Sequence, residues 1–330
     1  MRIFLPHAPD MLQNYYGATA VEGLSALGDV KINQLGHPLS TPELIREADG
    51  CQIIVSDRQT PGEAAAFRAL PDLIAFMRCA VDIRTIDVAA ASETGVLVTR
   101  ASPGFVPAVA ELAIGFMIDL GRNISPSTFE FRAGRRPPAP MGRQLDGSTL
   151  GIIGYGAIGR YLAELGIALG MQVLVSDPYV NIARGDVRQL PLGDLLPEAD
   201  FVVCLAVATE ETENLIDAKA LARMKRSAYF INLSRGNLVD ETALTIALDA
   251  GLIAGAAMDV GRAPDQMPSP RLAARHDVIA TPHLGGLTPP AIEHQAMETV
   301  AQAAEIVAGR APQGSVNAER AHRLSRLANS

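Results

Sequence analysis

Three glycines with the spacing Gly-x-Gly-x-x-Gly limit the possible folds of this chain more than any other feature. Gly154, Gly156 and Gly159 follow the apolar run 150–153 and open an amphipathic stretch. In a strand–turn–helix unit the first glycine permits a tight turn, the second lets the backbone approach a pyrophosphate, and the third lets helix and strand pack closely. The motif therefore predicts a parallel α/β domain that binds a dinucleotide.

Residues around the glycines point to the same ligand. The amides of Ala157 and Ile158 would point from the N-terminus of the helix at the phosphate charge. The next expected strand, 172–176, is followed by Asp177, 18 residues beyond the last glycine. A carboxylate there accepts hydrogen bonds from an adenosine ribose and repels a 2′-phosphate, which favours NAD over NADP. The alternative role for Asp177 is to cap a turn with Pro178.

Short apolar runs alternate with amphipathic stretches along almost the whole chain, which predicts parallel sheets covered by helices. The pair Pro103 and Gly104 interrupts this alternation, and 330 residues is about twice the usual domain length, so we expect two domains. We expect helices at 10–27, 106–122 and 288–308. We also expect a short helix that begins at Thr41, with Thr41 as its N-cap. The runs expected to form strands are 2–6, 52–55, 73–77, 96–99, 149–154, 172–177, 201–205, 228–233, 254–260 and 278–281.

Composition excludes several classes of protein. The net charge is −8 without a basic stretch, which argues against binding nucleic acid. The longest uncharged run, 278–292, has 15 residues and three prolines, too short and too broken to span a membrane. Three widely spaced cysteines and an N-terminus without the long apolar segment of a signal peptide favour a cytoplasmic protein. Without Cys-x-x-Cys or His-x-x-x-His we expect no metal site.

Five stretches, the first of which contains the glycine motif, resemble the D-isomer-specific 2-hydroxyacid dehydrogenases in motif, order and spacing. They are 149–159 (TLGIIGYGAIG), 231–236 (INLSRG), 239–244 (VDETAL), 256–260 (AAMDV) and 281–288 (TPHLGGLT). The N-terminal part is similar more loosely, through Ile86-Asp87 and Val109-Ala-Glu111. The resemblance covers most of the chain and is specific in the C-terminal two-thirds.

The resemblance implies a fold, a reaction and an assembly. It implies two Rossmann-like, doubly wound parallel-sheet α/β domains, with an NAD domain (104–286) inserted into a discontinuous substrate domain (1–103 and 287–330). It also implies NAD as cofactor and a homodimer formed largely through the NAD domains. The reaction it implies is interconversion of a D-2-hydroxy acid and its 2-oxo acid by hydride transfer.

Two side chains fit the needs of that reaction. Arg235 comes just after the expected strand 229–233, at the end where α/β sheets bind ligands. A guanidinium grips a carboxylate with two hydrogen bonds and stabilises charge on a carbonyl oxygen, although a surface ion pair is the common role of an arginine. His283 follows the strand 278–280, and imidazole is well matched to proton transfer near neutrality. By resemblance His283 is the general acid/base.

Other cofactor contacts follow from the resemblance alone. Asp259 would accept a hydrogen bond from the nicotinamide carboxamide, and its alternative role is to cap a turn. Thr209 and Leu233 would touch the cofactor largely through hydroxyl or backbone groups. Val207 stands where many relatives carry proline, so that loop is expected to differ in shape.

The loop that binds the substrate carboxylate departs from the family pattern. Relatives usually carry two glycines where this chain has Ala80 and Asp82. The amides of Cys79, Ala80 and Val81 remain candidates for binding a carboxylate.

Two interpretations of this departure stay open. In one, Asp82 lies close to the substrate and disfavours a second anionic group. In the other, Asp82 points away and Arg78 or Arg84 supplies positive charge, as a phosphorylated substrate would need. Arg58, after the strand 52–55, is another possible substrate contact.

The acid that normally pairs with the catalytic histidine is also displaced. Relatives carry Glu-Pro five and six positions after the carboxamide-binding aspartate, where this chain has Pro264 and Asp265. Either Asp265 takes the place of that glutamate from the neighbouring position, or the chain lacks the pair of acid and histidine.

Two other functions fit the motifs in part. One is an NAD(H)-sensing binding protein of the co-repressor type without significant turnover, which the missing glutamate favours and the presence of Arg235 and His283 disfavours. The other is a formate dehydrogenase-like enzyme, which pairs the histidine with glutamine. Gln266 lies two positions out of register for that role, and the chain is short for that group.

Overall fold

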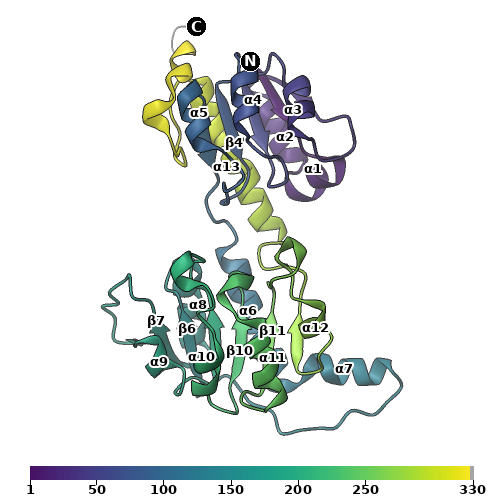
Figure 1. Ribbon diagram of the computed structural model, residues 1–330, viewed down its shortest axis with the longest axis vertical. Helices are drawn as coiled ribbons and strands as arrows, with labels where there is room; N and C mark the ends of the chain where they lie inside the picture. The colour runs from purple at the N-terminus through teal and green to yellow at the C-terminus, as the bar shows by residue number, and fades with distance from the viewer. Residues whose placement is uncertain (328–330) are drawn as a thin grey trace. The chain divides into compact units, whose positions relative to one another are not determined.

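A computed structural model describes residues 1–327, and at Asp265 it describes the backbone but not the side chain. These residues form two compact units. The first comprises Met1–Phe105 and the segment from Thr288 onward, and the second comprises Val106–Leu287. The beginning and the end of the chain therefore lie in one unit (Figure 1). The expected fold class, one doubly wound α/β unit inserted into another, is confirmed.

The first unit has helices on both faces of a five-stranded parallel sheet, in the order β2-β1-β3-β4-β5. Its strands are β1 (Arg2–Leu5), β2 (Asp29–Ile32), β3 (Ile53–Ser56), β4 (Ala75–Arg78) and β5 (Leu97–Arg100), and its α-helices are α1 (Pro9–Tyr15), α2 (Ala18–Ser25), α3 (Thr41–Glu47), α4 (Ala64–Ala69), α5 (Val88–Thr94) and α13 (Pro289–Val307). Side chains alternate between the faces of a strand. Ile54 accordingly packs in one core with Phe67 of α4, and Ile53 packs in the other with Leu24 of α2.

Two sequence expectations for this unit were wrong. The helix expected at 10–27 is two helices, α1 and α2, because Gly17 between them has a φ of 89°, a left-handed conformation that a helix cannot contain. Helix α3 begins with Thr41 as its first residue, and Ser40 is its N-cap. Ser40 and Glu43 form a capping box in which the Ser40 amide donates to Glu43 Oε2 over 2.9 Å.

The second unit contains a seven-stranded parallel sheet in the order β12-β11-β10-β9-β6-β7-β8. Its strands are β6 (Thr149–Ile153), β7 (Gln172–Ser176), β8 (Val187–Gln189), β9 (Phe201–Cys204), β10 (Tyr229–Asn232), β11 (Gly255–Met258) and β12 (Val278–Ala280). Its α-helices are α6 (Val106–Arg122), α7 (Ile124–Arg132), α8 (Ala157–Ala168), α9 (Leu192–Leu195), α10 (Ala218–Arg223), α11 (Glu241–Asp249) and α12 (Pro270–Ala273). The chain proceeds from β6 to β8 in one direction and from β9 to β12 in the other. The order therefore reverses between β6 and β9, and ligands bind outside the carboxyl ends of strands at such a point.

Strands β2 and β8 were not expected from the sequence. Each lies at the edge of its sheet, and each has polar residues and partial exposure instead of an apolar run. Edge strands are commonly short and polar because one side of the strand has no neighbour. Their hydrophobic pattern is consequently too weak to predict them.

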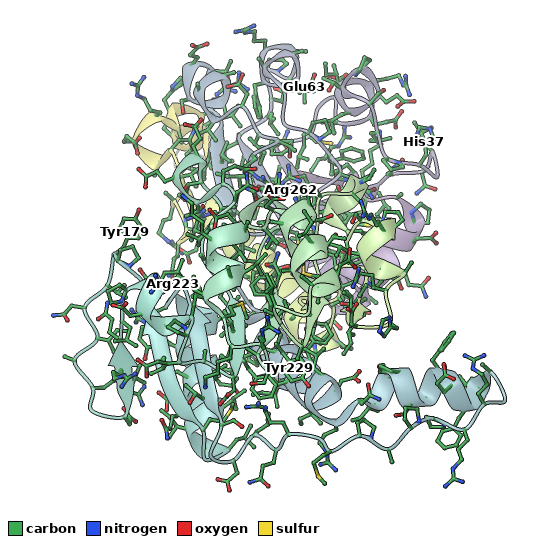
Figure 2. All side chains as sticks on the ribbon, turned by 60° about the horizontal axis from the view of Figure 1, so that its bottom comes forward. His37, Glu63, Tyr179, Arg223, Tyr229 and Arg262 are labelled. Atoms are coloured by element: carbon green, nitrogen blue, oxygen red, sulfur yellow. The ribbon has the colours of Figure 1, made fainter. Side chains whose placement is uncertain are left out.

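Helix α7 lies apart from the sheet of the second unit, followed by an irregular segment that returns to β6 (Figures 1 and 2). None of its residues is buried within the described chain. Phe129 and Phe131 have 66% and 67% of their surface exposed. The helix thus presents aromatic side chains without covering the core of its own unit.

Candidate cofactor and substrate site

The glycine motif forms the turn between β6 and α8. Gly154 has a φ of 97°, and a Cβ there would lie 2.7 Å from the amide nitrogen of Ala206. At Gly159 a Cβ would collide with the carbonyl oxygen of Gly154. Both glycines are therefore required by the protein itself. At Gly156, in contrast, a Cβ would meet no protein atom within 4 Å, so this position leaves open space beside the backbone.

The N-terminus of α8 opens onto that space. Ala157 is the first residue of the helix, and both Gly156 and Ala157 are exposed. The first amides of a helix lack partners within the helix and carry partial positive charge. Open space and unpaired amides together fit the pyrophosphate of a dinucleotide.

Asp177 is fixed beside the glycine motif. Its Oδ2 accepts a hydrogen bond of 2.7 Å from the Tyr155 amide, and its Oδ1 accepts one of 2.9 Å from the Tyr179 amide. The side chain therefore does more than cap its own turn, because it also contacts the turn after β6. Each carboxylate oxygen keeps a further lone pair with which it can accept from a ribose hydroxyl.

Arg235, Asp259 and His283 follow three neighbouring strands, β10, β11 and β12. Parallel strands present their carboxyl ends at one edge, and neighbours lie about 4.8 Å apart. All three residues thus lie at the edge that carries the glycine motif. The structure brings these sequence-predicted residues of the second unit together.

The loop that carries Arg235 is held by its neighbours. Asn232, fully buried, donates through Nδ2 to the Arg235 carbonyl over 3.0 Å and accepts from the Ser234 amide over 3.1 Å. Arg235 Nη1 donates to the Ser234 carbonyl over 2.7 Å. Gly236 packs against the Gly261 backbone so closely that a Cβ there would collide with it. The sequence Asn-x-x-Arg-Gly therefore fixes the backbone on both sides of the guanidinium.

Asp259 organises the loop that carries His283. Its side chain is buried, with 2% exposed. Oδ1 accepts hydrogen bonds from Thr281 Oγ1 over 2.6 Å and from the Leu284 amide over 2.7 Å. Oδ2 accepts one from the Gly285 amide over 2.9 Å. The Asp259 carbonyl also accepts from the His283 amide over 3.0 Å. Asp259 thus has a structural role, and its expected contact with the nicotinamide stays a prediction.

The remaining predicted cofactor contacts lie along the same edge. Thr209 is the N-cap of the short helix η1 (Glu210–Thr212), and its amide donates to Thr212 Oγ1 over 2.8 Å. Leu233 is buried, with its amide donating to the Cys204 carbonyl. Val207 is exposed in the loop after β9. Their contacts with the cofactor stay predictions.

The predicted carboxylate-binding loop follows β4 in the first unit. The Cys79 amide already donates to the Ser56 carbonyl over 2.9 Å, which leaves the amides of Ala80 and Val81 as the better donors for a ligand. Burial raises the pKa of the Cys79 thiol to about 12, so the thiol stays protonated at neutral pH. The Cys79 amide is thus already engaged within the unit, and binding of a carboxylate by this loop stays a prediction.

The charged residues near this loop are not equally accessible. Arg84 holds Asp82 through Nη2–Oδ2 and Nε–Oδ1 distances of 2.6 and 3.0 Å. Arg78 is fully buried, its Nη2 donates to the Thr60 carbonyl over 3.0 Å, and burial lowers its pKa to about 10. Arg58 is exposed. Arg84 is thus engaged by Asp82, and Arg78 belongs to the interior of the unit.

The loop after β11 contains the displaced acid. Pro264, Asp265 and Gln266 form the short helix η3, and the Gln266 carbonyl accepts from the Gly261 amide over 2.8 Å. The Asp265 side chain lies outside the described residues, so its pairing with His283 stays a prediction. Gln266 Oε1 is buried and has no hydrogen-bond partner among the described residues.

Sequence reasoning missed Arg262. Its guanidinium donates to Glu213 and Asn214 over 2.9 and 2.6 Å, and to the carbonyls of Val239 and Asn237 over 2.9 and 2.8 Å. It ties the loop after β11 to the segments before and after β10. The only sequence signal was its position three residues after Asp259, where the family pattern gives no reason to expect such a role.

Two absences concern the described part of the chain. None of its helices combines the length and apolar character needed to cross a membrane. Within residues 1–327, Asp265 apart, no group of three or more His, Cys, Asp or Glu side chains could hold a metal ion.

A family model described as D-isomer specific 2-hydroxyacid dehydrogenase, NAD binding domain, matches residues 114–285. The chain belongs to this family. Hydroxypyruvate reductase of Thermotoga maritima is 31% identical over 265 residues, which are 79% of this chain and 87% of that protein. D-3-phosphoglycerate dehydrogenase of Rattus norvegicus is 34% identical over 286 residues, 85% of this chain and 53% of the rat protein. The chain thus spans about half the length of the phosphoglycerate dehydrogenases it matches.

Solved structures have the same fold. The TT0316 protein of Thermus thermophilus superposes with a TM-score of 0.84 at 27% identity, covering 96% of this chain and all of that one. The NAD-complexed D-isomer specific 2-hydroxyacid dehydrogenase of Lactobacillus delbrueckii ssp. bulgaricus gives 0.81 at 26% identity with the same coverage. Together with the matched domain, these structures support NAD as the cofactor.

Proposed function

We propose that this 2-hydroxyacid dehydrogenase family member interconverts a D-2-hydroxy acid and its 2-oxo acid with NAD(H). The observation that carries the proposal is the placement of Arg235, Asp259 and His283 after three neighbouring strands, at the edge where the glycine motif also lies. Hydride transfer to a 2-oxo acid requires a cation for the carboxylate and a proton donor for the oxygen. Arg235 and His283 supply these two groups.

The chemistry divides between two side chains. Arg235 binds the substrate carboxylate and stabilises the negative charge that develops on the carbonyl oxygen during reduction. His283, as imidazolium, donates a proton to that oxygen, and in the oxidative direction the neutral ring accepts the hydroxyl proton. The bound cofactor supplies or accepts the hydride at the substrate C2 carbon. One proton and one hydride are thus added or removed together.

Cofactor binding is assigned to the carboxyl edge of the second sheet. The open space at Gly156 and the first amides of α8 suit the pyrophosphate, and Asp177 suits the adenosine ribose. The complete set assigned to the cofactor is Gly154, Gly156, Ala157, Ile158, Gly159, Asp177, Thr209, Leu233 and Asp259.

The substrate carboxylate is assigned to Arg235 of the second unit. Within the first unit, the amides of Ala80 and Val81 in the loop after β4 are the better candidates for binding a carboxylate. Asp265 is assigned as the carboxylate partner of His283. A carboxylate that accepts a hydrogen bond from imidazole stabilises the imidazolium needed for reduction. The substrate is a small 2-oxo or 2-hydroxy acid.

The assembly we propose is a homodimer formed through the second unit. Helix α7 buries none of its residues in the described chain and exposes Phe129 and Phe131. Aromatic side chains this exposed commonly mark an interaction surface. The family resemblance implies a second copy of the chain as the partner of the second unit, and we assign α7 to that interface.

The proposed activity is tested by mixing protein, NADH and a panel of 2-oxo acids, and following NADH absorbance. The panel contains glyoxylate, hydroxypyruvate, pyruvate and bulkier 2-oxo acids. We expect NADH oxidation with at least one of them and none when His283→Ala replaces the unmutated protein. Tight NADH binding without oxidation of NADH by any member of the panel would contradict the proposal and favour a binding protein.

A further inference from the structure

Arg262 joins the loop after β11 to two other segments of the second unit. Its side chain, labelled in Figure 2, donates through Nε to the Val239 carbonyl over 2.9 Å and through Nη2 to the Asn237 carbonyl over 2.8 Å. Nη2 also donates to Glu213 Oε1 over 2.9 Å and to Asn214 Oδ1 over 2.6 Å. A guanidinium is planar and its donors keep a fixed geometry, so it holds these four acceptors in one arrangement.

The two segments that Arg262 contacts are already paired with each other. The Ile216 amide donates to the Leu238 carbonyl over 2.9 Å, and the Asp240 amide donates to the Ile216 carbonyl over 3.1 Å. Residues 213–216 and 237–240 thus form a platform without help from Arg262. The contribution of Arg262 is to attach the loop after β11 to that platform.

The loop after β11, residues 261–267, is closed on itself. The Gly261 amide donates to the Gln266 carbonyl over 2.8 Å, a bond that shapes the loop but does not fix it to its neighbours. Arg262 does fix it, and from two directions. While its guanidinium reaches the platform, its amide donates to Glu241 Oε1, at the start of α11, over 2.8 Å.

The same loop packs against the backbone beside Arg235. Gly236, the next residue, contacts the Gly261 backbone so closely that a Cβ there would collide with it. At Gly261 a Cβ would in turn lie 2.7 Å from Glu241 Oε1, the acceptor of the Arg262 amide. No side chain separates the two backbones at this contact, and packed protein interiors transmit displacements. A shift of the loop 261–267 is therefore passed on to the backbone at Arg235.

We propose that Arg262 is a positioning residue for Arg235, which it keeps in place by fixing the loop 261–267 against Gly236. The inference rests on the proposed function, in which Arg235 binds and polarises the 2-oxo acid. The Arg262 side chain is 37% exposed, and a surface ion pair with Glu213 alone would contribute little. The three neutral acceptors, which a point charge cannot hold together, are what require an arginine.

Two substitutions separate the shape of the Arg262 side chain from its charge. Arg262→Lys keeps a cation beside Glu213 and loses the fork of donors, and Arg262→Met keeps only an aliphatic stem. We expect both to lower kcat/KM for the best 2-oxo acid by about tenfold to a hundredfold, the scale of loss when a reacting group is misplaced by up to about 1 Å. NADH binding, measured by calorimetry, should be unchanged, because Asp259 is held by its own hydrogen bonds to residues 281–285.

Arg275→Lys is the matched control. Arg275 also holds several acceptors, with Nε and Nη2 donating to Asp277 over 2.7 and 2.8 Å and Nη1 donating to Asp249 over 2.6 Å. It precedes β12, at the amino end of that strand and away from the edge that carries the site. Its replacement removes a comparable set of hydrogen bonds and should leave kcat/KM unchanged.

A double variant tests whether Arg262 acts through Arg235. Once Arg235→Lys has removed the two-pronged grip on the substrate, little is left for Arg262 to position. Adding Arg262→Lys to Arg235→Lys should therefore lower kcat/KM no further than Arg235→Lys alone. If Arg262 only stabilised the fold, the two losses would multiply.

Three results would overturn the inference and leave the proposed function standing. They are a normal kcat/KM in Arg262→Lys, a loss in Arg275→Lys equal to that in Arg262→Lys, and multiplied losses in the double variant. Absence of NADH oxidation by the unmutated protein with every 2-oxo acid tested would overturn the proposed function and the inference with it.

Discussion

His283 and Gln266 adopt left-handed backbone conformations, with φ of 56° and 59°, in the loops after two neighbouring strands. Such conformations cost a non-glycine residue roughly 1–3 kcal/mol and persist only where the surroundings enforce them. At His283 the enforcement is visible, because Asp259 accepts four hydrogen bonds from residues 281–285. The residue proposed to transfer the proton is thus one of the strained positions of the described chain.

Asp177→Ala should reduce the preference for NADH over NADPH. The carboxylate accepts from ribose hydroxyls and repels a 2′-phosphate, so its removal favours NADPH relative to NADH. We expect the ratio of the two kcat/KM values to fall by about tenfold or more, the factor that corresponds to 1.4 kcal/mol. Steady-state kinetics with both cofactors measure the ratio. Equal efficiency with NADH and NADPH in the unmutated protein would refute the assignment of Asp177.

Asp265→Asn should shift the pH dependence of reduction. A carboxylate partner raises the pKa of His283 by favouring the imidazolium, and reduction needs the protonated ring. The upper limb of the kcat/KM profile for 2-oxo acid reduction should therefore move to lower pH. Asp194→Asn, a change to an acid of α9, is the control and should leave the limb in place. A profile that does not move would show that Asp265 is a solvated loop acid.

His7 should make the first unit less stable in mild acid. The residue is 1% exposed, neither ring nitrogen has a hydrogen-bond partner among the described residues, and burial lowers its pKa from 6.5 to about 4. Between these values the unfolded chain binds the proton and the folded chain does not, so stability falls as the pH drops from 6.5 towards 4. The difference corresponds to about 3 kcal/mol.

Urea unfolding at pH 7 and pH 4.5 measures the loss for His7. From pH 7 to pH 4.5 the free energy of unfolding should decrease less in His7→Gln than in the unmutated protein. The difference should be a large part of about 3 kcal/mol, whatever the stability of the variant at pH 7. The same decrease in His7→Gln and in the unmutated protein would mean that His7 titrates normally.

Among the elements, the turn between β6 and α8 was the part that the sequence predicted best. Three glycines, an apolar run and a following carboxylate all report on local geometry, and Gly154 and Gly159 are indeed required by close backbone contacts. Strands β10, β11 and β12 were likewise predictable, because each is mainly apolar, with β11 fully buried and β12 buried at Val278. Strands β2 and β8 were not predictable, since edge strands carry little hydrophobic pattern.

Contacts between distant residues escaped prediction for a different reason. The Cys79 amide donates to the Ser56 carbonyl, 23 positions earlier in the chain, and this contact depends on how the loop folds, which residue types alone do not specify. The Tyr179 hydroxyl likewise donates to Glu211, which lies 32 positions further along the chain. Such pairs become visible only once the strand order is known.

Helix α7 should be required for the dimer and not for the fold. The double replacement Phe129→Ser and Phe131→Ser removes the exposed aromatic surface without touching a buried residue. We expect the dimer to dissociate at least tenfold more readily, with the unfolding temperature of the isolated monomer little changed. Analytical ultracentrifugation over a range of concentrations measures the change.

Ile246→Ser provides the control for α7, because Ile246 is an exposed apolar residue of α11 in the same unit. It should leave the dimer intact. A monomeric unmutated protein, or a double variant that associates as the unmutated protein does, would contradict the assigned interface.

At the scale of the whole molecule, the strand order turns scattered sequence motifs into one site. Motifs at 154–159, 231–236, 256–260 and 281–288 are far apart in the chain, yet β6, β9, β10, β11 and β12 are consecutive neighbours along the sheet. Hydrophobic periodicity predicts the strands but not their order, because the pairing of β6 with β9 bypasses two intervening strands. The resemblance to the dehydrogenase family implied a Rossmann-like, doubly wound sheet, and the structure adds the order of its strands.

The central claim is that Arg235 binds and polarises a 2-oxo acid, and Arg235→Lys tests it most directly. Lysine keeps the charge but loses the two-pronged geometry, so kcat/KM for the best 2-oxo acid should fall while NADH binding is unchanged. Arg223→Lys, a change to an exposed arginine of the second unit, should have no effect on either quantity. We predict a loss in kcat/KM of about 150-fold or more, which corresponds to roughly 3 kcal/mol of transition-state stabilisation. A kcat/KM within twofold of the unmutated value would show that Arg235 is structural and would contradict the proposed mechanism.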